Sequence, residues 1–146
     1  MGNLASTLLA QGDLAGARAL QDQSLAVLRR VQGEEHRDTL TSMGNLAATL
    51  HAQGDLAGAR AVDEQVLAVS RRVLGEEHPD TLTSMNNLAG TLWHCDERRD
   101  AIELMTRTVD TCTVKLGADH PTTRRRMNDL AQMRVAFDAS TVTPTP

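Results

Sequence analysis

The sequence has almost no aromatic residues: Trp93 and Phe137 are the only two among 146 residues, and tyrosine is absent. Leucine, alanine, valine and methionine must therefore form the hydrophobic core. Runs of β-branched residues are also scarce, whereas alanine, leucine, arginine, glutamine and glutamate are abundant. Because these side chains lose little rotamer freedom in a helix, we expect an all-α protein.

Long apolar runs and a positive net charge are missing as well. No stretch of about 18 apolar residues occurs, and the first residues lack the basic segment and cleavage site of a secretory signal, so we expect a cytoplasmic protein. The formal net charge of -4 provides no attraction to nucleic acid or anionic membranes. We therefore expect neither as a partner, and we interpret the basic run Arg124, Arg125 and Arg126 as a solvated helix face.

Cysteine is limited to Cys95 and Cys112, which lack metal-ligand spacing. Two such thiols in a cytoplasmic chain are expected to be free. Cys95 would end one helix and Cys112 would lie about 13 residues into the next. At a rise of 1.5 Å per residue they would be about 20 Å apart, too far for a disulfide.

An internal repeat is the strongest positive signal. A period of 42 residues aligns Met1, Met43, Met85 and Met127, and the first two blocks agree at 33 of 42 positions. The third block keeps the hydrophobic frame and the fourth is half a unit. The predicted organisation is one repeat domain over residues 1–137, with repeats over about 1–35, 36–77 and 78–119 and a closing helix over 120–137. Residues 138–146 are predicted to form a disordered tail.

Each block predicts two amphipathic helices, because apolar residues recur at helical spacing on both sides of a turn. In block two the turn is Gln53-Gly54-Asp55, where glycine can close one helix and aspartate can cap the next. Gly75 and Pro79 mark the break between blocks. The corresponding turn in block three has Asp96 in place of glycine, so it should be the softest point of the stack.

Such hairpins bury their faces only by stacking, which predicts a solenoid whose first helices line the inner surface. Small and polar residues form a second stripe on these first helices, separate from the core positions. We interpret the stripe as a concave groove, in which asparagine could pair with a peptide backbone. Its candidate binding residues are Thr41, Asn45, His51, Thr83, Asn86, Asn87, Trp93, His94 and Asn128.

The frame N-L-A-x-x-L-x-x-x-G-D-x-x-x-A, present at residues 45–59 and again at 3–17, resembles the tetratricopeptide repeat. The longer period and the stretch Leu74-Gly75-Glu76-Glu77-His78-Pro79-Asp80-Thr81-Leu82 are similar to the kinesin light chain subtype. The resemblance implies a right-handed α-solenoid of about seven helices that binds proteins. It also implies that Asn3, Asn45 and Asn87 line the groove, a ladder that Asp129 interrupts in the fourth block.

Two interpretations stay open for the site. The asparagines could instead hydrogen-bond neighbouring helices and hold the stack together. Trp93 could anchor a ligand or could pack beside the turn that contains Cys95.

Catalysis is not expected, because no nucleophile with a base, no phosphate loop and no metal-ligand pattern occurs. His36, His78 and His120 recur in the turns between blocks, and we interpret them as structural. We expect no cofactor and no metal.

The leading hypothesis is thus a scaffold that binds a peptide or protein segment in the groove. One alternative is a sensor or regulatory segment of a larger bacterial signalling ATPase, and another is a self-associating structural module. The first helix, with Leu4, Leu8 and Leu9, would lack a preceding hairpin. We therefore expect a possible homodimer through the N-terminal repeat.

Overall fold

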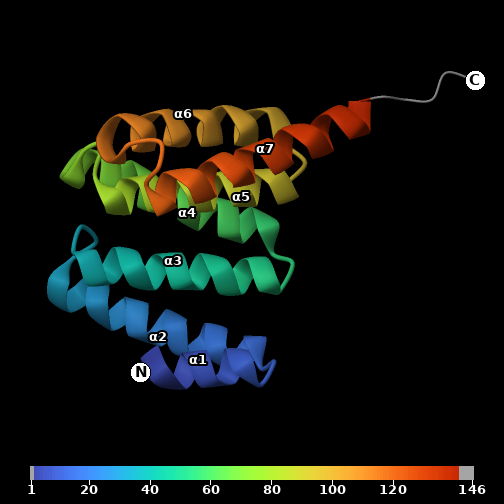
Figure 1. The fold of residues 1–146 in the computed structure, drawn as a ribbon. Coiled ribbons are helices and arrows are strands. Elements are labelled where there is room, and N and C mark those ends of the chain that lie inside the picture. Colours follow the sequence, from blue (N-terminus) through green and yellow to red (C-terminus); the bar gives the residue numbers. More distant parts are fainter. Residues whose placement is uncertain (1, 142–146) are drawn as a thin grey trace, which may run out of the picture. The chain divides into compact units, whose positions relative to one another are not determined.

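The computed structural model describes the backbone of residues 2–141 and the side chains of residues 4–141. This part of the chain is all helical, which confirms the predicted fold class, and Figure 1 shows the helices in chain order. It divides into two compact units, unit 1 (Met1–Gly75) and unit 2 (Glu76–Pro146). The helices are α1 (Gly2–Ala10), α2 (Leu14–Gln32), α3 (Arg37–Ala52), α4 (Leu56–Leu74), α5 (Pro79–His94), α6 (Arg98–Leu116) and α7 (Pro121–Thr141).

Short turns join the helices of each repeat into antiparallel hairpins, as predicted. Gly12 and Gly54 both have φ of 79°, in the left-handed region where glycine carries no steric cost. The following aspartates cap the second helices: Asp13 accepts a hydrogen bond from the backbone N–H of Gly16, and Asp55 does so from that of Gly58.

The turns between repeats use histidine as the cap of the next helix. The Nδ1 atoms of His36, His78 and His120 accept hydrogen bonds from the backbone N–H two residues later, at 3.2, 3.1 and 3.2 Å. An acceptor at this place satisfies one of the N–H groups that a helix start leaves unpaired. These histidines therefore have a structural role in the turn.

The third hairpin departs from the pattern where the sequence predicts weakness. Asp96 has φ of 66° and is the one residue other than glycine with positive φ among the described residues. Glu97, at the N-cap of α6, makes no side-chain hydrogen bond to the helix start. This turn lacks both the glycine and the aspartate cap of the first two hairpins.

The core of unit 1 lies between α2, α3 and α4. It is built around Met43, which is 1% exposed, with Leu25, Leu40, Leu46 and Leu50 packed in the same cluster. Burial of these aliphatic side chains holds the helices together in the absence of aromatic residues.

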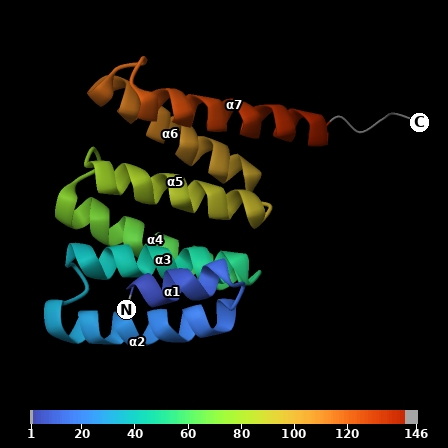
Figure 2. The ribbon, with the colours of Figure 1, turned by 60° about the horizontal axis from the view of Figure 1, so that its bottom comes forward.

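The core of unit 2 joins α5, α6 and α7, which follow one another in Figure 2. Ala89, Met105, Val109 and Leu130 form its buried cluster. Helix α7 runs to Thr141, four residues beyond the predicted end, so residues 138–141 are helical and the predicted tail begins too early. Residues 142–146 of that tail lie outside the described residues.

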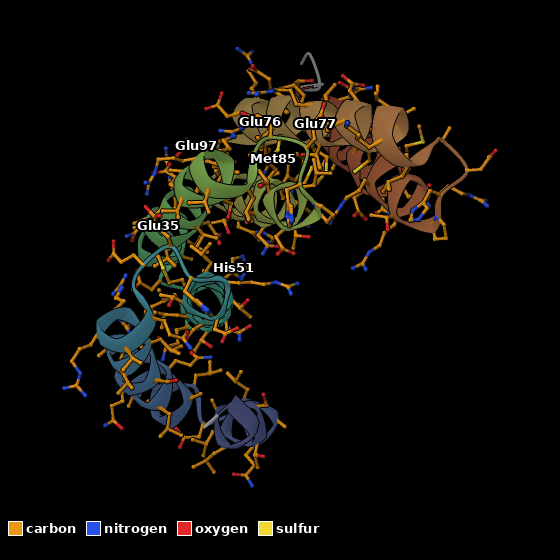
Figure 3. All side chains as sticks on the ribbon, turned by 90° about the vertical axis from the view of Figure 1, so that its left-hand side faces the viewer. Glu35, His51, Glu76, Glu77, Met85 and Glu97 are labelled. Carbon is orange, nitrogen blue, oxygen red and sulfur yellow. The ribbon has the colours of Figure 1, made fainter. Side chains whose placement is uncertain are left out.

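Acidic residues in the turns between repeats pair with basic residues at the ends of the second helices. In unit 1, Glu35 pairs with Arg72 of α4, and in unit 2, Glu77 pairs with Lys115 of α6. Figure 3 shows Glu35 on the turn before α3, and Glu76 with Glu77 on the turn before α5. The side chains in these pairs are 46–64% exposed to solvent. Each ion pair therefore adds about 1 kcal/mol or less to the free energy of unfolding.

None of the described helices combines the length and the apolar character that crossing a membrane requires.

Candidate functional site

Unit 1 contains a hollow between α1, α2 and α3, which we call the Gln21 hollow. Its volume is about 340 Å³, and two residues of the predicted stripe, Thr41 and Asn45, line it. The full lining is Ala5, Ser6, Leu9, Leu20, Gln21, Ser24, Leu28, Asp38, Thr41, Ser42, Asn45 and Ala48.

The Gln21 hollow is mostly aliphatic, with polar groups from α2 and α3. Gln21 is 7% exposed, and its Nε2 donates a hydrogen bond to the backbone oxygen of Asn45 at 3.4 Å. The Oε1 atom of Gln21 is buried and has no hydrogen-bond partner. Thr49 Oγ1 also donates to the Asn45 oxygen, at 3.1 Å. The backbone of Asn45 is therefore fixed from two sides, while its side chain is exposed.

Unit 2 contains a second hollow, between α5, α6 and α7, which we call the Trp93 hollow. Its volume is about 430 Å³. The Oδ1 atom of Asn86 is buried there without a hydrogen-bond partner. The lining consists of Asn86, Gly90, Trp93, Met105, Asp129, Gln132, Met133 and Ala136.

The two hollows occupy the same place in the repeat, because five residues of each lining correspond after a shift of two periods, 84 residues. Each is bounded by the two helices of one repeat and the first helix of the next. The two hollows differ in the side chains that line them at corresponding positions. The pairs are Ser6 and Gly90, Leu9 and Trp93, Gln21 and Met105, Asn45 and Asp129, and Ala48 and Gln132.

Two arginines lie close to the Trp93 hollow without lining it. The guanidinium carbon of Arg98, from the start of α6, lies 5.3 Å from the Trp93 ring centroid, a cation–π contact. Trp93 thus contacts the first residue of α6 and also lines a hollow, and its role as a ligand anchor stays a prediction. Burial lowers the pKa of Arg126, and the thiol of Cys112 and the carboxylate of Asp129 partly offset that shift.

Other predicted site residues lie outside the linings of these two hollows. Thr83 and Asn87 are exposed on α5, and Asn128 is exposed on α7. The Nδ1 atom of His94 lies 2.8 Å from the backbone oxygen of Gly90. His51 is half-buried on α3 (Figure 3). The side chain of Asn3 lies outside the described residues, although α1 includes its backbone.

Second-helix residues were absent from the sequence-based site. Gln21 of α2 and Met105 of α6 occupy the same position of the repeat and line the two hollows. In the sequence, Met105 is an ordinary apolar core residue, and Gln21 is an ordinary polar residue of a helix surface. The 42-residue alignment places them together and is the one signal that could have identified them.

Within residues 4–141, no group of three His, Cys, Asp or Glu side chains is arranged to hold a metal ion. Cys95 is half-buried and Cys112 is fully buried, and both are free thiols. Burial raises the pKa of the Cys112 thiol.

Comparison with solved structures gives a close likeness in fold. The nearly identical TPR-like repeats of a candidate kinesin light chain from Podosopora anserina match with a TM-score of 0.83 and 26% identity, over 97% of this chain and 75% of that one. A variant of that protein, in which methionine replaces one glutamine, matches equally well, over 74% of its length. BtubC (BKLC) from P. vanneervenii shares the fold, with a TM-score of 0.69, 16% identity, and coverage of 98% of this chain and 64% of that one.

Comparison with curated protein sequences finds no match. The family model for the tetratricopeptide repeat matches residues 1–70 and 45–110, which together cover most of the chain. The chain therefore belongs to the tetratricopeptide repeat family, and its repeats are similar to those of kinesin light chain type.

Proposed function

We propose that this chain is a protein–protein interaction scaffold that binds an extended peptide segment along the exposed stripe of its first helices. The tetratricopeptide repeat is in general a protein-interaction fold. The observation that carries the proposal is the recurrence of a hollow at the same place in both units. Volumes of this size accommodate single side chains of a partner.

The polar groups suit a peptide better than an apolar small molecule. Asn45 combines an exposed amide, which can both donate and accept, with an aliphatic hollow beside it. A peptide backbone offers the complementary N–H and C=O groups, and its side chains can enter the hollow. Asn87 presents a similar exposed amide on α5.

The test uses binding to a random-peptide display library, followed by titration of the best peptide. Asn45→Ala and Asn87→Ala should each weaken binding by about three- to tenfold, because each removes a hydrogen bond worth about 1 kcal/mol. Gln65→Ala is the matched control, since it removes an exposed amide from α4. It should leave affinity unchanged. Loss of helicity in the asparagine variants would instead assign those residues to the stability of the stack.

A second candidate function, self-association, is favoured by one observation. Leu4 is 55% exposed, whereas Leu46, at the equivalent position of the next repeat, is 7% exposed. An exposed leucine at a position that is otherwise buried favours association with a complementary surface. We therefore propose a homodimer through the N-terminal repeat as the alternative to a monomeric scaffold.

A further inference from the structure

We propose that the Trp93 hollow of unit 2 binds a basic side chain, arginine or lysine, of the partner peptide, whereas the Gln21 hollow of unit 1 takes an uncharged aliphatic one. The inference rests on the proposed peptide-binding function and specifies what each hollow selects. It follows from the chemistry that differs between two sites of the same geometry.

The lining of the Trp93 hollow contains one negative charge and no positive charge, because Arg98 and Arg126 lie outside it. Asp129 supplies a half-buried carboxylate, and Asn86 supplies a buried Oδ1 atom without a hydrogen-bond partner. The face of the Trp93 indole attracts cations through its quadrupole. Arginine and lysine carry donors without acceptors, so they match this set, whereas a carboxylate would meet repulsion.

The carboxylate of Asp129 is available for such a pairing. It makes no hydrogen bond and no ion pair with any other residue in the described part of the chain. Arg126 interacts with it electrostatically from one turn earlier on α7 but does not line the hollow. Arg98 already lies over the Trp93 ring, so a guanidinium fits against this indole.

At the positions of Asp129 and Trp93, unit 1 has Asn45 and Leu9, so it lacks that carboxylate and the aromatic face. Leu20 adds a further aliphatic group to the lining. An uncharged aliphatic side chain can pack against these groups.

The Gln21 hollow also contains polar groups. Asp38 lines it, but its carboxylate is 64% exposed and lies 3.8 Å from the Nδ1 atom of His36. The unpaired Oε1 atom of Gln21 is matched in unit 2 by the unpaired Oδ1 atom of Asn86, so the difference in charge between the hollows rests on Asp129.

Trp93 itself provides the measurement, because it is the sole tryptophan and the chain has no tyrosine. We would titrate the protein with four decapeptides of alanine and serine that differ in one central residue: arginine, lysine, norleucine or glutamate. The arginine and lysine peptides should change Trp93 fluorescence and bind the unit 2 hollow about five- to tenfold more tightly than the norleucine peptide. The glutamate peptide should bind most weakly.

Asp129→Asn removes the charge without changing the shape and installs the residue found at the equivalent place in unit 1. It should reduce arginine-peptide affinity to within about twofold of norleucine. Ala131→Asp adds a carboxylate at an exposed position of α7 outside the lining and serves as the matched control. It should not rescue an Asp129→Asn protein.

The outcomes separate this inference from the proposed function. Equal affinity for arginine and norleucine peptides, or an Asp129→Asn variant that binds arginine as well as the parent, would overturn the charge selectivity and leave peptide binding in place. If none of the four peptides shifts amide resonances of α3 or α5 in NMR titrations at millimolar concentration, both proposals fail.

Discussion

Gln21 of α2 is hydrogen-bonded to the backbone of Asn45 of α3, with 3.4 Å between Nε2 and the carbonyl oxygen. The bond joins the second helix of one repeat to the first helix of the next, at the wall of the Gln21 hollow. The same side chain leaves its Oε1 atom buried and without a partner. Folding therefore gives the Nε2 atom of Gln21 a hydrogen bond, but it removes water from the Oε1 atom without supplying a partner.

Replacing Gln21 by methionine should not destabilise unit 1. The change removes the unpaired Oε1 atom, keeps the side-chain volume and copies Met105 of unit 2, so the free energy of unfolding should stay equal or rise by about 1 kcal/mol. Gln21→Ala, which leaves a cavity, should lower it by about 1–2 kcal/mol. Urea unfolding measures both. A loss above about 1 kcal/mol in Gln21→Met would show that the bond to Asn45 dominates.

The turn at Asp96 should be improved by glycine. Because Asp96 has φ of 66°, Asp96→Gly should raise the free energy of unfolding by about 0.5–1 kcal/mol. The exposed ion pair with Arg98 that is lost contributes little. The reverse change in unit 1, Gly54→Asp, should destabilise by a similar amount. Thermal unfolding measures the stability of both variants. The prediction requires stability to rise in Asp96→Gly and to fall in Gly54→Asp.

The buried thiol of Cys112 should make stability fall at alkaline pH. Burial raises its pKa above the ordinary value of 9.0, with the charge of Arg126 opposing part of the shift. Above about pH 9 the unfolded chain loses a proton that the folded chain retains, so the free energy of unfolding decreases as pH rises through that range.

Cys112→Ala should be less stable than the parent at neutral pH because of the cavity, yet it should lose less stability between about pH 7.5 and pH 10. Cys95→Ala serves as the control for removal of a thiol that is only half-buried. Urea unfolding at the two pH values provides the comparison. An unchanged pH dependence in Cys112→Ala would assign the alkaline loss to other groups.

Self-association through the N-terminal repeat predicts that Leu4→Gln shifts the protein toward a monomer. Leu4 is 55% exposed, so the polar residue should be tolerated in the folded chain. Leu116→Gln, at another exposed leucine near the end of α6, should leave assembly unchanged. Sedimentation velocity at micromolar concentration measures the result. A parent protein that is monomeric throughout this range would contradict the dimer.

Much of the fold was accessible from sequence because it depends on neighbours along the chain. The glycines at positions 12 and 54 and the caps Asp13 and Asp55 act within one or two turns of helix, and they recur with the 42-residue period. Local hydrogen bonding and backbone sterics therefore predict the hairpins. The end of α7 was missed because nothing after Phe137 stops a helix until the prolines at 144 and 146.

The candidate site depended on contacts between helices, and sequence alone predicted only residues of the first helices. Asn45 lines the Gln21 hollow from the first helix of the next repeat, whereas Asn86 and Trp93 line the Trp93 hollow from the first helix of their own repeat. Gln21 and Met105 line the hollows from the second helices, and Asp129 lines the same hollow as Trp93 but from α7. Helical periodicity specifies the residues on one face of one helix. Packing between helices decides which faces meet, and therefore which side chains enclose a hollow together.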